Sequence, residues 1–191
     1  LDNLKNLKNK EWAGYVHGHN YGGKDGLNLQ QIYEAGKPFE NLIDHPSWIN
    51  YMMHFIGGRG TFDQLHGPLF IDENFANIRG PGEAIGIHSG NPEGLQRNHY
   101  RYQDGKFHCS QVNILLALTD IGPGDGGTVI IPSSHKSNIE HPEFKDNKMM
   151  KGGKASSASG MTAAKEIYMK AGDGLIFVDS LCHGSAKRIN K

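Results

Sequence analysis

The sequence has few cysteines, no long apolar run and no net charge. Two cysteines in 191 residues cannot form a disulfide framework, and this low usage favours an intracellular setting. The longest uninterrupted apolar run, residues 114–118, is far shorter than the roughly 20 residues of a membrane-spanning helix. Basic and acidic side chains both number 20, without the basic face that nucleic-acid binding requires. We therefore expect a cytoplasmic protein that binds neither membranes nor nucleic acids; its oligomeric state stays open.

The N-terminus shows no targeting signal. The first ten residues alternate leucine and asparagine with lysine, and they contain no apolar stretch like that of a signal peptide. Because the first residue is Leu1 rather than methionine, we expect that the sequence is not a complete gene product. The length itself corresponds to one ordinary domain.

Glycine is the residue present in excess. The sequence has 26 glycines in 191 residues, roughly twice the average proportion of about 7%. They follow no three-residue period and lie between apolar runs, which excludes collagen-like and low-complexity sequences. Glycine adopts positive φ without steric cost, so this distribution predicts many short strands joined by tight turns.

Two helices are predicted near the N-terminus. The first runs over residues 28–35 and has Asn28 as its cap. The second begins at Asp44-His45-Pro46, where proline suits the first helical position, and ends at Gly57-Gly58. Both helices are expected to pack against a larger unit.

Strands are predicted for most of the remaining chain. The candidate strands are residues 65–72, 84–88, 99–103, 106–118, 128–131, 165–170 and 175–178. Asp104-Gly105 lies between two of them and predicts a type I′ hairpin. In the strand 106–118 one face is apolar and the other carries Gln111 and Asn113, a pattern that fits either the lining of a ligand cavity or a solvated edge strand.

Two of the eleven histidines lie where a metal site could form. His88 ends the strand predicted over 84–88, and His183 follows the strand predicted over 175–178. Histidines that leave separate strands of one sandwich can converge on a metal ion. The alternative is that each has an ordinary structural role, as we expect for the exposed His17-Gly18-His19.

Three segments resemble the phytanoyl-CoA dioxygenase family. Residues 117–138 resemble its long central signature, residues 171–185 its distal-histidine strand, and residues 39–46 its usual lead-in. Members of this family are 2-oxoglutarate-dependent, non-haem iron(II) oxygenases. Their fold is mainly β, a double-stranded β-helix of the jelly-roll or cupin-like type, and here N-terminal helices are expected to pack on it.

The resemblance implies one domain over 1–191, with a helical lead-in over 1–60 and a β-sandwich core over 61–191. An intact member of the family continues past the distal histidine to an arginine that binds 2-oxoglutarate and to a closing strand. We therefore expect that this domain is truncated at its C-terminal end and that the arginine lies beyond Lys191.

The resemblance also implies roles for individual residues. His183 corresponds to the distal iron ligand, and Ser185 to the serine that contacts the 2-oxoglutarate carboxylate. His88 corresponds to the first histidine of a His-x-Asp motif, with Ser89 at its middle position. The sequence departs from the motif at Gly90, which stands where the family has its carboxylate ligand.

The missing carboxylate leaves three alternatives open. Chloride fills this position in related iron-dependent halogenases, so chlorination is one alternative. In an ordinary hydroxylase, a neighbouring carboxylate such as Glu93 or Asp104 would replace it. The third alternative is a non-catalytic domain that binds a small molecule and little or no iron.

Two further groups of side chains are candidates for ligand contacts. Gln111 and Asn113 are candidates for contacts to 2-oxoglutarate or to the metal ligands, or else bond only to neighbouring strands. Arg79, Arg97 and Arg101 could bind an acidic substrate, although solvated arginines are the simpler interpretation. The expected partner is a small organic molecule that the sequence does not identify.

Overall fold

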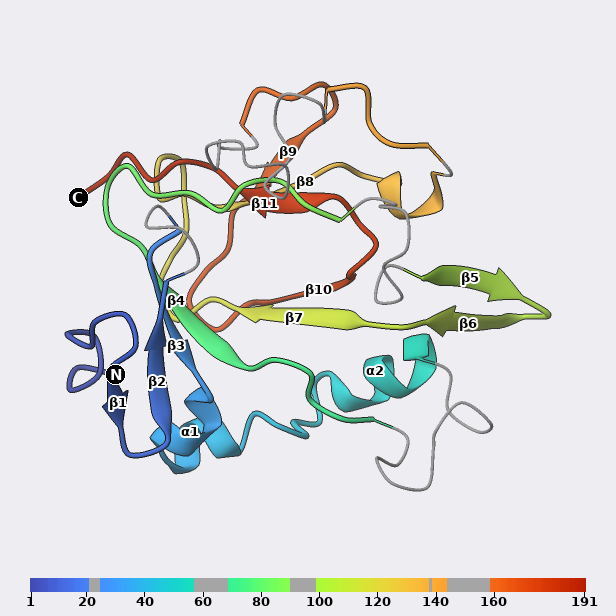
Figure 1. Ribbon diagram of the computed structural model, residues 1–191. Coiled ribbons are helices and arrows are strands. Elements are labelled where there is room, and N and C mark those ends of the chain that lie inside the picture. Colours follow the sequence, from blue (N-terminus) through green and yellow to red (C-terminus); the bar gives the residue numbers. More distant parts are fainter. Residues whose placement is uncertain (21–24, 57–68, 90–98, 138, 144–158) are drawn as a thin grey trace.

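Short antiparallel strands form most of the regular structure, as the glycine content predicts (Figure 1). The computed structural model describes residues 1–20, 25–56, 69–89, 99–137, 139–143 and 159–191. The expected mainly β class is confirmed. In these described residues, no helix is both long enough and apolar enough to cross a bilayer.

An antiparallel sheet of four strands forms the N-terminal part of the molecule, in the order β1-β2-β3-β4. The strands are β1 (Trp12–Ala13), β2 (Val16–His19), β3 (Leu27–Gln30) and β4 (Phe75–Ile78). A small core of almost fully buried side chains lies on this sheet, formed by Val16, Leu29 and Ile32. Through its pairing with β3, β4 therefore connects the N-terminal strands to residues 79–88, the segment that ends at His88.

The helix expected over residues 28–35 does not form, and this prediction is wrong. Its first half is β3, and a single 3₁₀ turn, η1 (Ile32–Ala35), follows. β3 is hydrogen-bonded to β2 on one edge and to β4 on the other. Leu29 packs with Val16 and Ile32, and the buried Asn28 side chain is hydrogen-bonded to Asp25 and Asn77. Gln31, with φ 58°, separates the strand from the turn. Pairing on both edges outweighs the helical periodicity of so short a segment.

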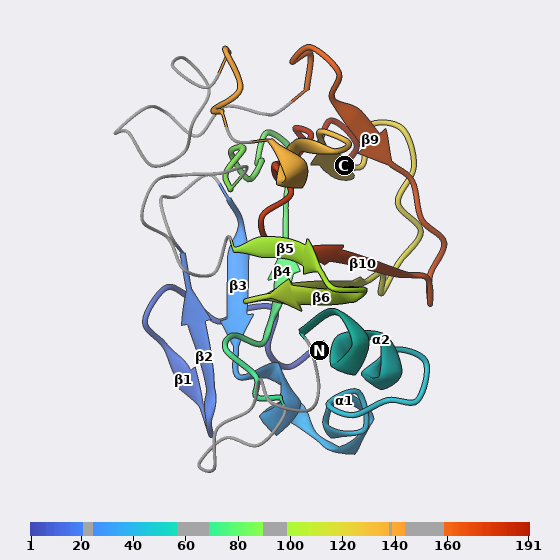
Figure 2. The same ribbon diagram turned by 90° about the vertical axis from the view of Figure 1, so that its right-hand side faces the viewer.

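The second expected helix is present but begins later than predicted. Two helices occupy this region, α1 (Lys37–Glu40) and α2 (Ile49–Ile56). Before α2, the His45 carbonyl accepts hydrogen bonds from the backbone N–H groups of Trp48 and Ile49. The predicted end at Gly57-Gly58 lies outside the described residues. α2 packs against strand β6, as Figure 2 shows.

The Asp104-Gly105 hairpin is confirmed. It joins β5 (Tyr100–Gln103) to β6 (Lys106–Cys109), and Gln103 pairs with Lys106 across the turn. Asp104 and Gly105 have φ angles of 53° and 76°, the positive values that a type I′ turn requires.

Two facing groups of strands form the rest of the structure (Figure 1). In one, β7 (Val112–Leu116) pairs with β10 (Gly174–Val178). In the other, β11 (His183–Ser185) pairs with β8 (Thr128–Ile130), and β8 pairs with β9 (Lys165–Ile167). The main buried cluster lies on the second group and contains Ile87, Val129, Ile131, Met161, Cys182 and Ala186.

Three strand predictions differ from the structure. The segment expected as a strand over 84–88 is not one of the strands, and it pairs with β11 through an isolated bridge between His88 and His183. The strand expected over 106–118 is divided into β6 and β7 at residues 110–111. The strand expected over 65–72 lies partly outside the described residues, and its described part, 69–72, is not a strand. The strand in this region is β4, which begins at Phe75.

Candidate functional site

His88 and His183 lie directly opposite each other on adjacent extended segments. His183 is the first residue of β11, and the chain that ends at His88 runs along its edge. The N–H of His88 donates to the carbonyl of His183 at 2.9 Å, and the N–H of His183 donates back at 3.1 Å. Such a pair places both side chains on one face, and the ring centroids are 4.1 Å apart. The structure therefore brings together two histidines that are far apart in the sequence.

Each histidine ring is oriented by a carbonyl of its own segment. Nδ1 of His88 lies 2.9 Å from the oxygen of Gly86, and Nδ1 of His183 lies 2.6 Å from the oxygen of Leu181. A carbonyl oxygen only accepts hydrogen bonds, so Nδ1 carries the proton in each neutral ring. The lone pair is then on Nε2. A hydrogen bond of this kind is what orients metal-binding histidines in proteins.

A glycine allows the two segments to approach this closely. Gly184 follows His183, and a Cβ added there would lie 2.9 Å from the oxygen of Ile85 and 3.0 Å from the carbonyl carbon of Gly86. These are backbone atoms of the segment that ends at His88, so a side chain could be accommodated only by separating the two segments.

Gly184→Ala is expected to lower the free energy of unfolding by about 1–3 kcal/mol, because it overpacks the contact between the two segments. The same displacement moves His88 away from His183 and weakens metal binding. Gly174→Ala is the matched control, since a Cβ on that β10 glycine meets no atom within 4 Å. Thermal unfolding and iron(II) titration of both variants check the prediction. Equal behaviour of the two variants would show that the close approach has no energetic role.

A buried carboxylate connects three of the predicted site residues. Asp179, which directly follows β10, is only 4% exposed. Its Oδ1 accepts a hydrogen bond from Nδ2 of Asn113 at 3.0 Å, and its Oδ2 accepts one from Oγ of Ser89 at 3.3 Å. Nε2 of Gln111 lies 3.4 Å from Oδ1 of Asn113, and the backbone N–H of Asp179 donates to the Gln111 carbonyl. Asp179 therefore joins β7, the β10–β11 turn and the residue after His88.

Sequence reasoning missed Asp179. It is a single carboxylate directly after an apolar strand, four positions before His183, and that placement is the signal that could have indicated it. Its partners lie on two other segments, so the hydrogen-bond network itself depends on the tertiary fold. Polar groups buried to this degree need such partners, because an unpaired carboxylate is costly to desolvate.

Ser185 contacts a partly buried arginine. In β11 it lies two positions after His183, and alternate residues of a strand face the same side. Its Oγ accepts hydrogen bonds from Nη1 of Arg79 at 2.5 Å and from the N–H of Ile85 at 2.7 Å. Arg79 also donates to the carbonyl of Gly126. Burial lowers the pKa of Arg79, with Arg188 adding to the effect, yet the group remains charged at neutral pH.

The arginine prediction therefore needs correction. Arg79 is held inside the structure rather than solvated, because Ser185 and two backbone carbonyls bind its guanidinium. Arg101 is exposed on β5, as expected. Arg97 lies outside the described residues.

The third ligand position is not described by the structure. Gly90 and Glu93 both lie outside the described residues. Asp104 is described, and it lies exposed in the turn of the β5–β6 hairpin. In the part of the chain that the structure describes, no group of three or more histidine, cysteine, aspartate or glutamate side chains is placed to hold a metal. Asp179 is thus connected to Ser89 without completing a three-residue metal site.

Other histidines have structural surroundings. His17 stacks on Trp12 at 4.5 Å, and His45 packs against Trp48. For His17 this contact agrees with the structural role expected above, but His17 and His19 are half-buried in β2 rather than exposed, so the expected exposure is wrong. The two cysteines are buried and unbridged, and burial raises the pKa of the Cys109 thiol to about 11, which leaves it protonated at neutral pH.

A family model and a curated protein both match most of this chain. The model of the family described as Phytanoyl-CoA dioxygenase (PhyH) matches residues 25–190. The dioxygenase cdmD of Talaromyces verruculosus is 24% identical over 176 residues, which are 86% of this chain and 48% of that protein. The chain therefore spans about half the length of this curated relative.

Solved structures of HygX from Streptomyces hygroscopicus have a similar fold. HygX with nickel, 2-oxoglutarate and hygromycin B bound superposes with a TM-score of 0.70 at 20% identity, covering 92% of this chain and 69% of HygX. HygX with iron bound gives a TM-score of 0.68 at 22% identity, covering 86% of this chain and 66% of HygX. At this level of identity the likeness is one of fold.

Proposed function

The chain belongs to the phytanoyl-CoA dioxygenase family, and on that premise we propose that it is a 2-oxoglutarate-dependent, non-haem iron(II) oxygenase that hydroxylates a small organic molecule. The two facing groups of strands are the arrangement expected of a double-stranded β-helix. HygX, which shares the fold, has been solved with iron and with 2-oxoglutarate.

The opposed histidine pair is the observation that carries the proposal. His88 and His183 are the two residues that the family motif assigns to iron, and the fold places their rings 4.1 Å apart. Both rings are fixed in the tautomer that leaves the lone pair on Nε2. The residues present therefore fit an iron(II) ion on two of its coordination positions. Gly90 has no side chain to contribute, so we assign the two imidazoles as protein ligands and leave the carboxylate that a hydroxylase would add as its third ligand unassigned.

Bound at this position, iron(II) supplies redox chemistry in which 2-oxoglutarate and dioxygen yield succinate, carbon dioxide and a hydroxylated substrate. The protein orients the participants. His88 is held by its backbone pairing with His183 and by the neighbouring Ser89–Asp179 hydrogen bond. Phe177 packs edge-on against the His183 ring at 4.7 Å and keeps water from that side of the imidazole.

Ser185 and Arg79 are the groups that we assign to the cosubstrate side. Ser185 lies on the same face of β11 as His183, and the Arg79 guanidinium is hydrogen-bonded to it. The arginine places a positive charge next to the serine that the family motif assigns to the 2-oxoglutarate carboxylate. Gln111 and Asn113 act through Asp179, since both belong to its hydrogen-bond network. The further arginine expected beyond Lys191 stays a prediction.

Anaerobic mixing of the protein with iron(II) and 2-oxoglutarate is expected to give the weak visible charge-transfer band of a ternary complex. Admission of air should then release succinate in an amount equal to the 2-oxoglutarate consumed. Absorption spectroscopy and quantification of succinate measure the two steps. Measurable 2-oxoglutarate binding without iron affinity, band or succinate would identify a binding domain and contradict the oxygenase proposal.

A further inference from the structure

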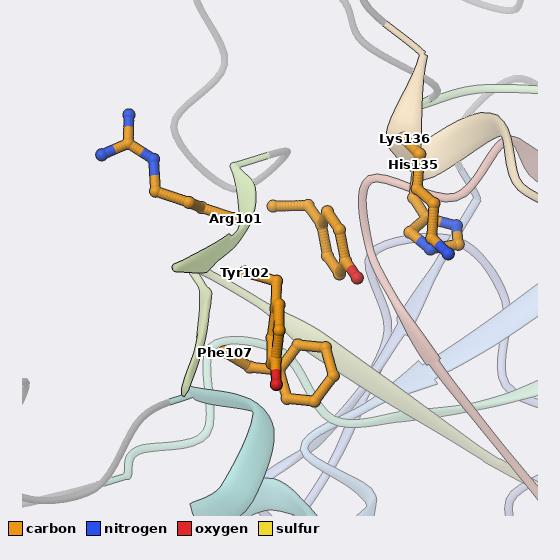
Figure 3. A pocket seen from close by; sticks show the side chains of 6 residues that line it. Arg101, Tyr102, Phe107, His135 and Lys136 are labelled. Carbon is orange, nitrogen blue, oxygen red and sulfur yellow. The ribbon is translucent and has the colours of Figure 1, made fainter. Parts of the chain in front are cut away.

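An open pocket lies between the β5–β6 hairpin and the short turn η3 (Ser134–Lys136). Its volume is about 520 Å³, within the usual range for small-molecule sites. The described residues that line it are Tyr100, Arg101, Tyr102, Phe107, His135 and Lys136. Figure 3 shows Tyr102 and Phe107 on one side and His135 and Lys136 on the other.

The pocket wall is built mainly from rings. Tyr102 and Phe107 have centroids 4.8 Å apart, and Tyr100 meets His135 edge-on at 4.6 Å. Burial lowers the pKa of His135, and Lys136 lowers it further, so this imidazole is uncharged at neutral pH and behaves as part of the aromatic wall. Aromatic side chains bind planar apolar groups through stacked or edge-to-face contacts.

The charge at the pocket opening has one sign. Lys136 and Arg101 are exposed cations, and none of the six described lining residues is acidic. In Figure 3 the Arg101 guanidinium points away from the other lining side chains, and its Nη1 donates a hydrogen bond to Oε1 of Gln103. Since Arg101 is turned away, Lys136, which belongs to η3, is the cation available to a ligand in the pocket.

One hydrogen bond links the pocket wall to the histidine pair. The N–H of Cys182 donates to Oγ of Ser134 at 2.8 Å. His135 follows Ser134, and His183 follows Cys182, so each side of this bond leads directly to one of the two sites. The η3 side of the pocket is therefore hydrogen-bonded to the segment that carries His183.

We infer that this pocket binds the substrate, and that the substrate is a small organic anion with a planar, apolar body. The ring system would contact Tyr102, Phe107 and Tyr100, and the anionic group would face Lys136. This assignment rests on the proposed function for its link to turnover, whereas the binding itself does not require iron.

Naphthalene-2-carboxylate is a suitable probe, with naphthalene-2-carboxamide and 2-naphthylmethylamine as its neutral and cationic analogues. We expect the carboxylate to bind the metal-free chain about fivefold more tightly than the carboxamide, in keeping with an exposed charge pair. The amine should bind most weakly. Calorimetric titration with each probe gives the dissociation constants. Equal affinity for all three probes would overturn the assignment of charge.

Substitutions at two exposed lining residues test where the probes bind, and they should leave the fold intact. Tyr102→Ala is expected to weaken binding of the carboxylate and of the carboxamide by about tenfold, because both lose the same ring contact. Lys136→Gln should remove only the preference for the carboxylate. The matched controls are Tyr15→Ala and Lys37→Gln, which alter exposed residues elsewhere and should bind as the wild type does. Unchanged binding in Tyr102→Ala and Lys136→Gln would place the ligand outside this pocket.

The iron experiment separates the two proposals. If the charge-transfer band and succinate appear while no probe binds, the pocket assignment fails and the oxygenase proposal stands. If the carboxylate binds with the expected pattern of variants but neither band nor succinate is observed, the pocket binds a ligand of the inferred chemistry, while the oxygenase proposal and the role of that ligand as its substrate fail.

Discussion

Replacing His183 with alanine is expected to lower the iron(II) affinity by at least about 100-fold and to stop 2-oxoglutarate turnover. The expectation follows from the assignment of two protein ligands, of which this imidazole is one. Loss of a residue that merely orients a metal ligand already costs about 10–100-fold in affinity, so loss of a ligand itself should cost at least as much. Anaerobic iron(II) titration and the charge-transfer band measure the effect.

Packing changes need to be separated from ligand loss in this experiment. The His183 ring contacts His88 and Phe177, so alanine also leaves space in the structure. His183→Gln fills most of that space but provides no imidazole, and it should lose iron to the same extent. His17→Ala is the control on the N-terminal sheet and should bind iron normally. Retained affinity in both His183 variants, or lost affinity in His17→Ala, would contradict the assignment.

Asp179→Ala is expected to lower the free energy of unfolding by about 2–4 kcal/mol, because it leaves the Ser89 hydroxyl and the Asn113 amide without their common acceptor. Iron affinity should fall about 10–100-fold, since Ser89 adjoins His88 and its position depends on this carboxylate. Asp179→Asn keeps one acceptor oxygen and should show a smaller loss of both quantities. Chemical denaturation and iron titration measure the two effects separately.

A surface carboxylate provides the comparison for Asp179. Asp120 forms an exposed ion pair with Lys170 at 2.9 Å and accepts a hydrogen bond from the N–H of Ala171, for which asparagine keeps an acceptor oxygen. Asp120→Asn should therefore change the free energy of unfolding far less than Asp179→Asn does and leave iron affinity unchanged. If Asp179→Asn lowers stability but iron affinity stays at the wild-type level, Asp179 has only a structural role. If neither quantity changes, the hydrogen bonds seen in the structure contribute nothing to the site.

Local chemistry explains which parts of the fold the sequence predicts well. The Asp104-Gly105 hairpin forms as expected because its two residues satisfy a backbone requirement on their own. The helix expected over 28–35 fails because that segment is paired to β2 and β4, and β4 lies some 45 positions further along the chain (75 minus 30). Pairing between distant segments leaves no mark in the local pattern.

In the candidate site, too, the sequence indicates individual residues but not the contacts between distant segments. His88 and His183 could be named because the resemblance covers the motifs around them, although nothing in their spacing shows that their backbones pair. Ser89 and Asn113 could be named, but their common partner Asp179 could not, since the contacts join three segments of the fold. The sequence alone leaves Arg79 in solvent because its partners, among them Ser185 and the carbonyl of Gly126, belong to segments from much later in the chain.

Crystals of the iron(II)-loaded protein would test the central claim most directly, through anomalous diffraction recorded at the iron absorption edge. The histidine pair predicts one dominant anomalous peak about 2.0–2.2 Å from the Nε2 atoms of both His88 and His183, by analogy with metal–imidazole bonds at zinc sites. A dominant peak at another group of side chains, or iron bound to only one of the two histidines, would contradict the account.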